Sequence, residues 1–515
     1  MSWTRTRLAA LILVLATEPL VAQAAQGGAG EPLSAIDWLS DSVSLPSPVI
    51  TPPPVAPPAA PVPPVTVLPL GAPVADDAGL FLARDIGLPA NLWGGSSAND
   101  LARAFLAVPE ISTPTLRDFY ASLAQAKFEP PVDAAVDNSL FLARLDTLLS
   151  LARLTEAEAL IQAAGPPQPQ SFRRTFDIAL LNGTENAACE IISTNPDISP
   201  TFPARIFCLA RNGEWDVAAL TLGTAEALGI LSDTEDQLLL HFLDPELFED
   251  EELLPRPSSL SPLLFRLYEA IGERPATDSL PIAFAVADLS ETVGWRVRLR
   301  AAERLTAAGA LPPEELLAVI STRRPSASGG IWSRVSAIQS LRAALSGNNA
   351  VQISRSLPPA WDAAVSAGYH AALAPWIASR LQGVALERQA HHTAFEIALF
   401  SNDIDMARKY AGSSQDDQSL LAILTGAPFE MRNATPLDIA IRRSLSGLPP
   451  PESYRMLLRD NRSGEALLKA IAVLAEGVEA DPTALANALS LLKALELDRL
   501  ARRVAAELLL ENSQI

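Results

Sequence analysis

Proline is the residue that most limits the folds open to this chain, which contains 43 prolines among 515 residues. A proline inside an α-helix or a central strand removes a hydrogen bond, whereas one at the first helical position is well tolerated. Many prolines beyond residue 76 directly follow a side chain that can cap a helix. These pairs are Thr113-Pro114, Asp244-Pro245, Ser261-Pro262, Thr435-Pro436 and Asp481-Pro482. Each pair predicts a helix that begins at the proline.

Apolar residues beyond residue 76 recur at helical spacing, and strand patterns are almost absent. Two examples are Phe141, Leu145, Leu148 and Leu149, and then Leu497, Leu500, Ala501, Val504 and Leu508. Thr155 with Glu158, and Ser232 with Glu235, have the spacing of capping boxes. The chain is 49% hydrophobic but only 6% aromatic, so its core must consist mainly of Leu and Ala, which favour helices over sheets. We therefore predict an all-α fold of roughly 22 to 26 short helices.

Four predicted turns between helices look alike, and they lie at residues 151–159, 180–188, 209–218 and 399–407. In each, an apolar helix end leads into a small polar turn, and a small residue then allows the next helix to pack closely. This pattern resembles the turn within tetratricopeptide-like helical-repeat proteins of the bacterial periplasm. The resemblance implies an α-solenoid of antiparallel helix pairs over residues 77–515, with a candidate division near 245–260. It implies no particular binding residues.

The first 24 residues have the pattern of a cleavable signal peptide. Arg5 and Arg7 form a basic segment, residues 8–16 are apolar, and Ala22 and Ala24 are small residues suited to a signal peptidase. An uncleaved membrane anchor is the alternative, but a spanning helix needs about 20 apolar residues and Glu18 interrupts this run. No cysteine lies near the cleavage site, so a lipoprotein is not expected. These features predict a periplasmic protein.

Residues 25–76 have the composition of a disordered tail. Twelve of the 28 residues in 46–73 are proline, which predicts a semi-rigid polyproline spacer. Upstream of this spacer, residues 33–43 form a short apolar motif that is too short to be a stable isolated helix. Its apolar residues are Leu33, Ile36, Trp38, Leu39 and Val43. We predict that the motif docks on a partner protein. The alternatives are that it docks on the protein itself or has no role.

Cys189 and Cys208 are the only cysteines of the chain. They are equidistant from a predicted turn at residues 195–200, so a helical hairpin folded about that turn would bring them together. Export would place them in an oxidising compartment, and we predict a disulfide bond between them. The alternative is a pair of buried free thiols.

Three clusters in the sequence are candidate chemical sites. Glu387 and His391 have the spacing of a helical metal-ligand pair but lack an evident third ligand. Six of the nine residues at 244–252 are acidic, but they lack the ligand spacing of a calcium loop. Glu452-Ser453 matches the start of the Glu-Ser motif of lytic transglycosylases, without its glycine-rich continuation. We therefore predict no catalytic, metal or cofactor-binding residues and no cofactor.

Five tryptophans are candidate contact points for a partner, although packing in the core is the favoured interpretation of each. They are Trp215, Trp295, Trp332, Trp361 and Trp376.

The formal net charge of −20 argues against nucleic acid as a partner, because nucleic-acid binding depends on clustered Lys and Arg. It favours neutral or cationic partners. The fold class and the predicted export together suggest a non-enzymatic cell-envelope scaffold that binds a protein or peptide in a helical groove. The alternatives are a peptidoglycan-modifying enzyme or enzyme regulator, and a periplasmic chaperone.

Overall fold

The computed structural model describes residues 75–134, 138–248, 254–255, 257, 259–429 and 434–514. The predicted signal peptide, the apolar motif at 33–43 and the proline-rich spacer at 46–73 lie outside these residues. Ala75 and Asp76, assigned above to the tail, form part of the first helical turn of the folded region. All described residues belong to one compact unit.

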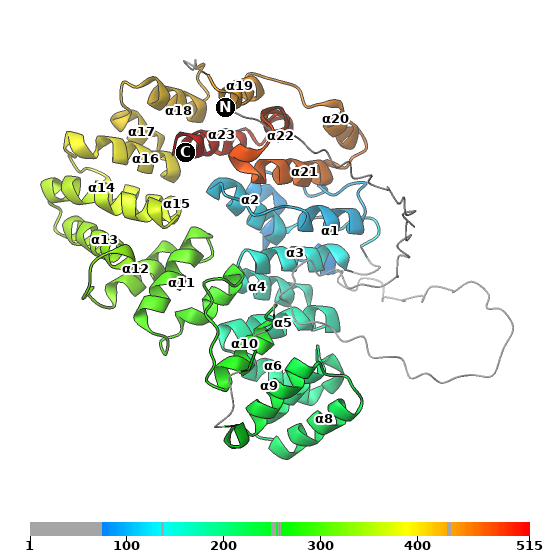
Figure 1. Cartoon of the computed structure of the whole chain (residues 1–515). Coiled ribbons are helices and arrows are strands. Elements are labelled where there is room, and N and C mark those ends of the chain that lie inside the picture. The colour runs from blue at the N-terminus through cyan, green and yellow to red at the C-terminus, as the bar shows by residue number, and fades with distance from the viewer. Residues whose placement is uncertain are drawn as a thin grey trace, which may run out of the picture. The chain divides into compact units, whose positions relative to one another are not determined.

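The described residues form an almost entirely helical fold, so the predicted all-α class is confirmed (Figure 1). They contain 23 α-helices, within the expected range. The first twelve are α1 (Ala98–Leu106), α2 (Pro114–Gln125), α3 (Ser139–Ser150), α4 (Leu154–Ala164), α5 (Pro169–Asn182), α6 (Glu185–Thr194), α7 (Phe202–Arg211), α8 (Trp215–Ala227), α9 (Asp233–Leu243), α10 (Pro262–Ala270), α11 (Trp295–Ala307) and α12 (Pro313–Ser321). The others are α13 (Gly330–Ser346), α14 (Ala350–Ser366), α15 (His370–Leu381), α16 (His391–Ser401), α17 (Ile404–Tyr410), α18 (Gln415–Thr425), α19 (Pro436–Leu445), α20 (Glu452–Arg459), α21 (Ser463–Ala475), α22 (Pro482–Ala494) and α23 (Asp498–Gln514).

Short 3-10 helices and one small sheet complete the described secondary structure. The 3-10 helices are η1 (Ala75–Asp77), η2 (Ala83–Ile86), η3 (Pro196–Ile198), η4 (Pro245–Phe248), η5 (Ile282–Leu289), η6 (Arg388–Ala390) and η7 (Gly477–Glu479). Strands β1 (Phe81–Leu82) and β2 (Ala126–Lys127) pair in parallel, with Phe81 opposite Ala126. Nothing in the sequence pattern predicted this pair.

Most of the predicted helix starts are confirmed. Pro262, Pro436 and Pro482 begin α10, α19 and α22, and in each case the preceding side chain accepts a hydrogen bond from the backbone N–H of the third helical residue. Ser232 and Glu235 form the predicted capping box of α9. Pro245 begins a 3-10 helix rather than an α-helix. These caps satisfy backbone donors that a helix start would otherwise leave unpaired.

Two predicted caps are wrong. Helix α4 begins at Leu154, so Thr155 lies inside the helix and cannot cap it. Ala152, two residues before α4, adopts a positive φ of 56°, which ends α3 sharply and lets α4 start earlier than its polar pattern suggests. At α2, Pro114 is the first residue, but the Thr113 side chain makes no capping hydrogen bond.

The four similar turns all connect consecutive helices that pack against each other. They join α3 to α4, α5 to α6, α7 to α8 and α16 to α17. Cys189 of α6 and Cys208 of α7 form the predicted disulfide bond, with their Cα atoms 4.9 Å apart. The disulfide bond links the two helices of a hairpin, as the spacing of the two cysteines predicted.

The core is built mainly from Leu and Ala, as the composition predicted. It also contains charged residues that no local pattern indicated. Arg144 is fully buried, and its guanidinium donates hydrogen bonds to the carbonyl oxygens of Ala124 and Ala126 at the end of α2. Burial lowers the pKa of Arg144 to about 10. The Arg174 guanidinium donates two hydrogen bonds of 2.7 Å to the buried carboxylate of Asp146.

Helices from the two ends of the described chain pack together. Helix α2 contacts α21 and α23, and α1 contacts α21 (Figure 1). Glu507 of α23 accepts hydrogen bonds from the backbone N–H of Thr115 at 3.0 Å and from its hydroxyl at 2.5 Å. Glu507 therefore caps α2 in place of Thr113. Near the candidate division at 245–260, α10 packs against both α5 and α9, so contacts cross the acidic stretch.

Candidate functional site

The outer face of helix α8 is apolar although it is exposed. Val217, Leu220 and Leu228 are 45%, 73% and 66% exposed. Together with Thr221 and Thr224 they have the spacing i, i+3, i+4, i+7 and i+11, which places all five on one side of a helix. Large exposed apolar surfaces are unusual unless they serve binding. We call these five residues the α8 outer face.

The inner side of α8 is also apolar, which explains why the helix folds where it does. Its buried residues are Ala218, Leu222 and Ala225, and α8 packs against α7 and α9. Two small residues at this contact allow the helices to approach closely. Because this inner stripe is sufficient to fix the helix, the hydrophobic residues on the outer face are not needed for its packing.

The two threonines of the α8 outer face add little polarity to it. The hydroxyl of Thr221 donates to the carbonyl oxygen of Val217 at 2.7 Å, and that of Thr224 donates to Leu220 at 2.8 Å. Each hydroxyl is thereby paired within the helix backbone. The outer face consequently has few free hydrogen-bonding groups to favour its contact with water.

Negative charge is concentrated in the sequence that forms this face and the helix after it. The described residues 212–248 contain eight Asp and Glu residues and no Lys or Arg. At the junction of α8 and α9, burial raises the pKa of Asp236, and the carboxylates of Glu226 and Asp233 raise it further. The α8 outer face is therefore an apolar surface in an acidic neighbourhood.

Trp215 extends the exposed apolar surface at the start of α8. It is 50% exposed, and its ring lies 6.1 Å from that of Phe242 in α9, which in turn stacks on Phe207. The Trp215 ring is thus held by aromatic packing on one side and remains open to solvent on the other. Partly exposed, fixed tryptophans are typical contact residues in protein interfaces.

The other four candidate tryptophans contribute mainly to packing. Trp295 and Trp332 have ring centres 5.2 Å apart, and the Trp295 indole donates to the Val319 carbonyl oxygen. Trp361 is 2% exposed and donates to Glu396 at 2.9 Å. The guanidinium of Arg380 covers the Trp376 ring.

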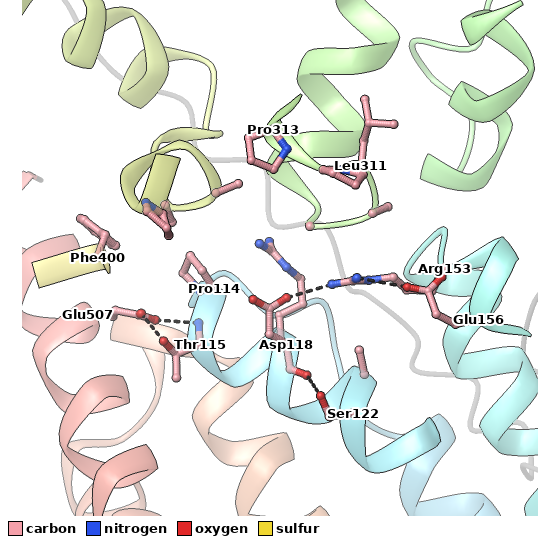
Figure 2. A pocket seen from close by; sticks show the side chains of 18 of the residues that line it. Pro114, Thr115, Asp118, Ser122, Arg153, Glu156, Leu311, Pro313, Phe400 and Glu507 are labelled. Carbon is pink, nitrogen blue, oxygen red and sulfur yellow. Dashed lines mark hydrogen bonds and ion pairs between the residues drawn. The ribbon is translucent and has the colours of Figure 1, made fainter. Parts of the chain in front are cut away.

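A second feature is a cavity of about 540 Å³ between α2, α4, α15, α23 and the turn that joins α11 to α12 (Figure 2). Figure 2 shows Asp118, Arg153 and Glu156 on one side, Leu311 and Pro313 of the turn opposite them, and Glu507 beyond Thr115. Segments far apart in the sequence therefore meet at this cavity. Its volume lies within the range of small-molecule sites.

Most carboxylates of this cavity are already paired. Arg153 donates to Asp118 at 2.9 Å and to Glu156 at 3.3 Å. Glu507 accepts the two hydrogen bonds from Thr115, and burial raises its pKa. The guanidinium of Arg117 lines the same cavity and has no hydrogen-bond or ion-pair partner among the described residues.

His370 lies behind the cavity wall. Its ring packs edge-on against Phe400, which lines the cavity, with ring centres 4.7 Å apart. Burial, together with the charge of Arg117, lowers the pKa of His370 to about 4. The imidazole is therefore neutral near pH 7, and its buried Nδ1 has no hydrogen-bond partner among the described residues.

The candidate metal ligands are not arranged as their spacing suggested. Glu387 precedes η6, and His391 begins α16, so the two residues do not share one helical turn. The His391 ring contacts the carbonyl oxygen of Leu386 at 3.1 Å. Within the described ranges, no three His, Cys, Asp or Glu residues are grouped closely enough to hold a metal ion.

Glu452, the residue of the transglycosylase-like match, is exposed at the start of α20. Its carboxylate pairs with Arg459 and Arg455, and the hydrogen bond from Arg459 holds the pKa of Glu452 below its ordinary value. A general acid for glycoside cleavage requires a raised pKa. This geometry does not favour that role for Glu452.

The fold and these two features define an all-α protein with an exposed apolar helix face and a polar cavity. Comparison with protein families, curated proteins and solved structures finds no match for this chain. Among the helices of the described ranges, none has both the length and the apolar character needed to cross a membrane.

The α8 outer face was missed in the sequence, although a signal was present. Residues 215–228 are apolar on both sides of a helix rather than on one, and they lie in a stretch without Lys or Arg. The cavity left no such signal, because its lining comes from helices separated by hundreds of residues. The predicted docking residues of the motif at 33–43 lie outside the described residues.

Proposed function

We propose that this chain is a non-catalytic, exported scaffold protein that binds a cationic, amphipathic segment of a partner protein on the α8 outer face. The observation that carries the proposal is the exposure of Val217, Leu220 and Leu228 on one side of a helix that is already packed on its other side. Burial of apolar surface stabilises association by about 25 cal/mol per Å² before the costs of binding.

The negative charge near the α8 outer face favours some binding partners over others. A second copy of this chain would bring two acidic regions together, because a twofold interface places the same surface on both subunits. The chain's own segment at 33–43 contains Asp37 and Asp41, so it is repelled as well. A membrane surface rich in anionic lipid is disfavoured for the same reason. A partner with Lys and Arg beside its apolar residues complements the region.

Export is part of the proposal. It is supported by the sequence pattern of the first 24 residues and by the Cys189–Cys208 disulfide, since such bonds persist in oxidising compartments. A periplasmic location and an α-solenoid arrangement follow from the same proposal. The apolar motif at 33–43 would engage a second partner.

The test measures binding of a fluorescent amphipathic Leu/Lys helix peptide to the full chain by anisotropy. Leu220→Asp and Leu228→Asp should each weaken binding at least about tenfold, which corresponds to about 1.4 kcal/mol. Met456→Asp is the matched control, because Met456 is 52% exposed on α20, away from α8. A Leu/Glu peptide and a Leu/Lys peptide of scrambled order should bind poorly. Equal binding to Leu220→Asp and the unmodified chain would refute the proposed face.

The chaperone alternative predicts a different outcome. A general chaperone would suppress aggregation of unrelated unfolded proteins, and Leu220→Asp would reduce that activity for all of them. A dedicated scaffold should protect none of them and should still bind the cationic peptide.

A further inference from the structure

The cavity between α2, α4, α15, α23 and the α11–α12 turn is independent of the α8 outer face and points to a different ligand. Its carboxylates are occupied, since Asp118 and Glu156 pair with Arg153, and Glu507 pairs with Thr115. The charge left without a partner is positive. It belongs to Arg117, and Arg503 adds a second guanidinium at the cavity wall.

The surroundings of the Arg117 side chain disfavour its charged guanidinium. Its Nε is buried, and the side chain has no hydrogen-bond partner among the described residues. Desolvation lowers the pKa of Arg117 despite the nearby carboxylate of Asp118. An unpaired buried donor destabilises a protein by about 1–3 kcal/mol, so such a side chain usually serves something other than stability.

Other unpaired donors surround the same space. The Nε of Arg153 is buried without a partner among the described residues, although its terminal nitrogens are paired. Gly309, at φ +71°, brings the α11–α12 turn directly against this group. A Cβ atom at Gly309 would lie 3.1 Å from both the Arg153 Nη2 and the Asp118 Oδ1. The turn therefore confines the guanidinium groups within the cavity.

The first turn of α15 adds backbone donors. Ala371 and Ala372 line the cavity, and the N-cap residue Tyr369 makes no side-chain capping bond. The N-terminus of a helix favours negative charge, because its N–H groups and dipole point outward.

We propose that this cavity binds a small molecule through a carboxylate or phosphate oxyanion that pairs with Arg117 and the first-turn N–H groups of α15. A guanidinium donates two parallel hydrogen bonds to either group. The volume of about 540 Å³ exceeds that of an isolated phosphate ion, so the oxyanion belongs to a larger molecule. This site goes beyond the partner-binding role proposed for α8.

The test uses isothermal titration of the full chain with inorganic phosphate and, separately, with succinate at matched ionic strength. At least one of them should bind, and Arg117→Met should weaken that binding at least about tenfold. Binding of phosphate alone identifies a phosphorylated ligand, and binding of succinate alone identifies a carboxylate. No binding of either, or equal binding by Arg117→Met, would overturn the proposal.

Two further variants keep the result interpretable. Arg298→Met is the matched control, because the Arg298 Nε also lacks a partner among the described residues but lies in α11 outside the cavity. It should bind the oxyanion normally. If Arg117→Met does not fold, Ala372→Glu places a carboxylate at the cavity wall and should abolish binding. Without ligand, Arg117→Met should melt at an equal or higher temperature than the unmodified chain, whereas a structural role for Arg117 predicts a lower one.

Discussion

The carboxylate of Glu507, near the end of the chain, caps helix α2 through Thr115, which lies 392 positions earlier in the sequence. This contact joins the last helix to the second across the cavity wall in Figure 2. Glu507→Ala should lower the free energy of unfolding by about 1–3 kcal/mol, because it leaves the partly buried N–H and hydroxyl of Thr115 without their acceptor. Chemical denaturation measures this loss.

Glu511→Ala provides the control for this prediction. Among the described residues, Glu511 accepts only one long hydrogen bond, 3.4 Å from the exposed hydroxyl of Ser112, so its removal should change stability by less than about 0.5 kcal/mol. Equal effects of the two substitutions would show that the Glu507 contact is not special.

Glu507 should also make the stability of the protein depend on pH. Burial raises the pKa of Glu507 above its ordinary value of 4.5, against the opposing hydrogen bonds from Thr115. The native state therefore holds this proton where the unfolded chain has released it. The contribution of Glu507 is full below pH 4.5 and is lost as the pH rises through the folded pKa. The stability of the unmodified chain relative to Glu507→Gln should fall across this window and then level off. A difference that rises with pH would contradict the assignment.

The Cys189–Cys208 bond should stabilise the fold by restricting the unfolded chain. For the observed separation of 19 residues, the loop-entropy model gives about 3 kcal/mol. The paired substitution of both cysteines by alanine should lower the free energy of unfolding by that amount, and reductant should then have no further effect. Quantitative alkylation of the purified protein without reductant would count against the bond.

For the buried ion pair of Arg174 and Asp146, removing one partner should destabilise the protein more than replacing both. Asp146→Asn should cost about 3–5 kcal/mol, since it leaves a desolvated guanidinium without its counter-charge. Replacing both residues together, as Arg174→Met with Asp146→Leu, should recover most of that loss. A double-mutant cycle on the free energy of unfolding measures the difference, and additive losses would argue against this coupling.

Local features of the fold were predictable from local sequence. Pro262, Pro436 and Pro482 follow capping side chains, and the helix geometry at these starts depends on the next three residues only. The disulfide was predictable because Cys189 and Cys208 flank a short turn at equal distance.

The remaining features depend on tertiary contacts. Thr113 has the right chemistry to cap α2, but Glu507 provides the cap instead, and no spacing rule links residues so far apart. Arg144 can be buried because its guanidinium donates to the carbonyl oxygens of Ala124 and Ala126, where α2 meets β2. No sequence pattern marked Arg117 as a site residue. Its distinguishing feature is a buried Nε without a hydrogen-bond partner among the described residues, and that depends on the folded structure.

The most direct test of the proposed partner surface is hydrogen exchange of the full chain with and without the Leu/Lys peptide. We predict slower exchange of backbone amides in residues 215–228, with little change in α20, where Met456 is similarly exposed. Leu220→Asp should remove this protection while leaving the exchange of the free protein unchanged, because Leu220 is 73% exposed. Protection centred elsewhere, or retained in full by Leu220→Asp, would contradict the assignment of the α8 outer face as a binding surface.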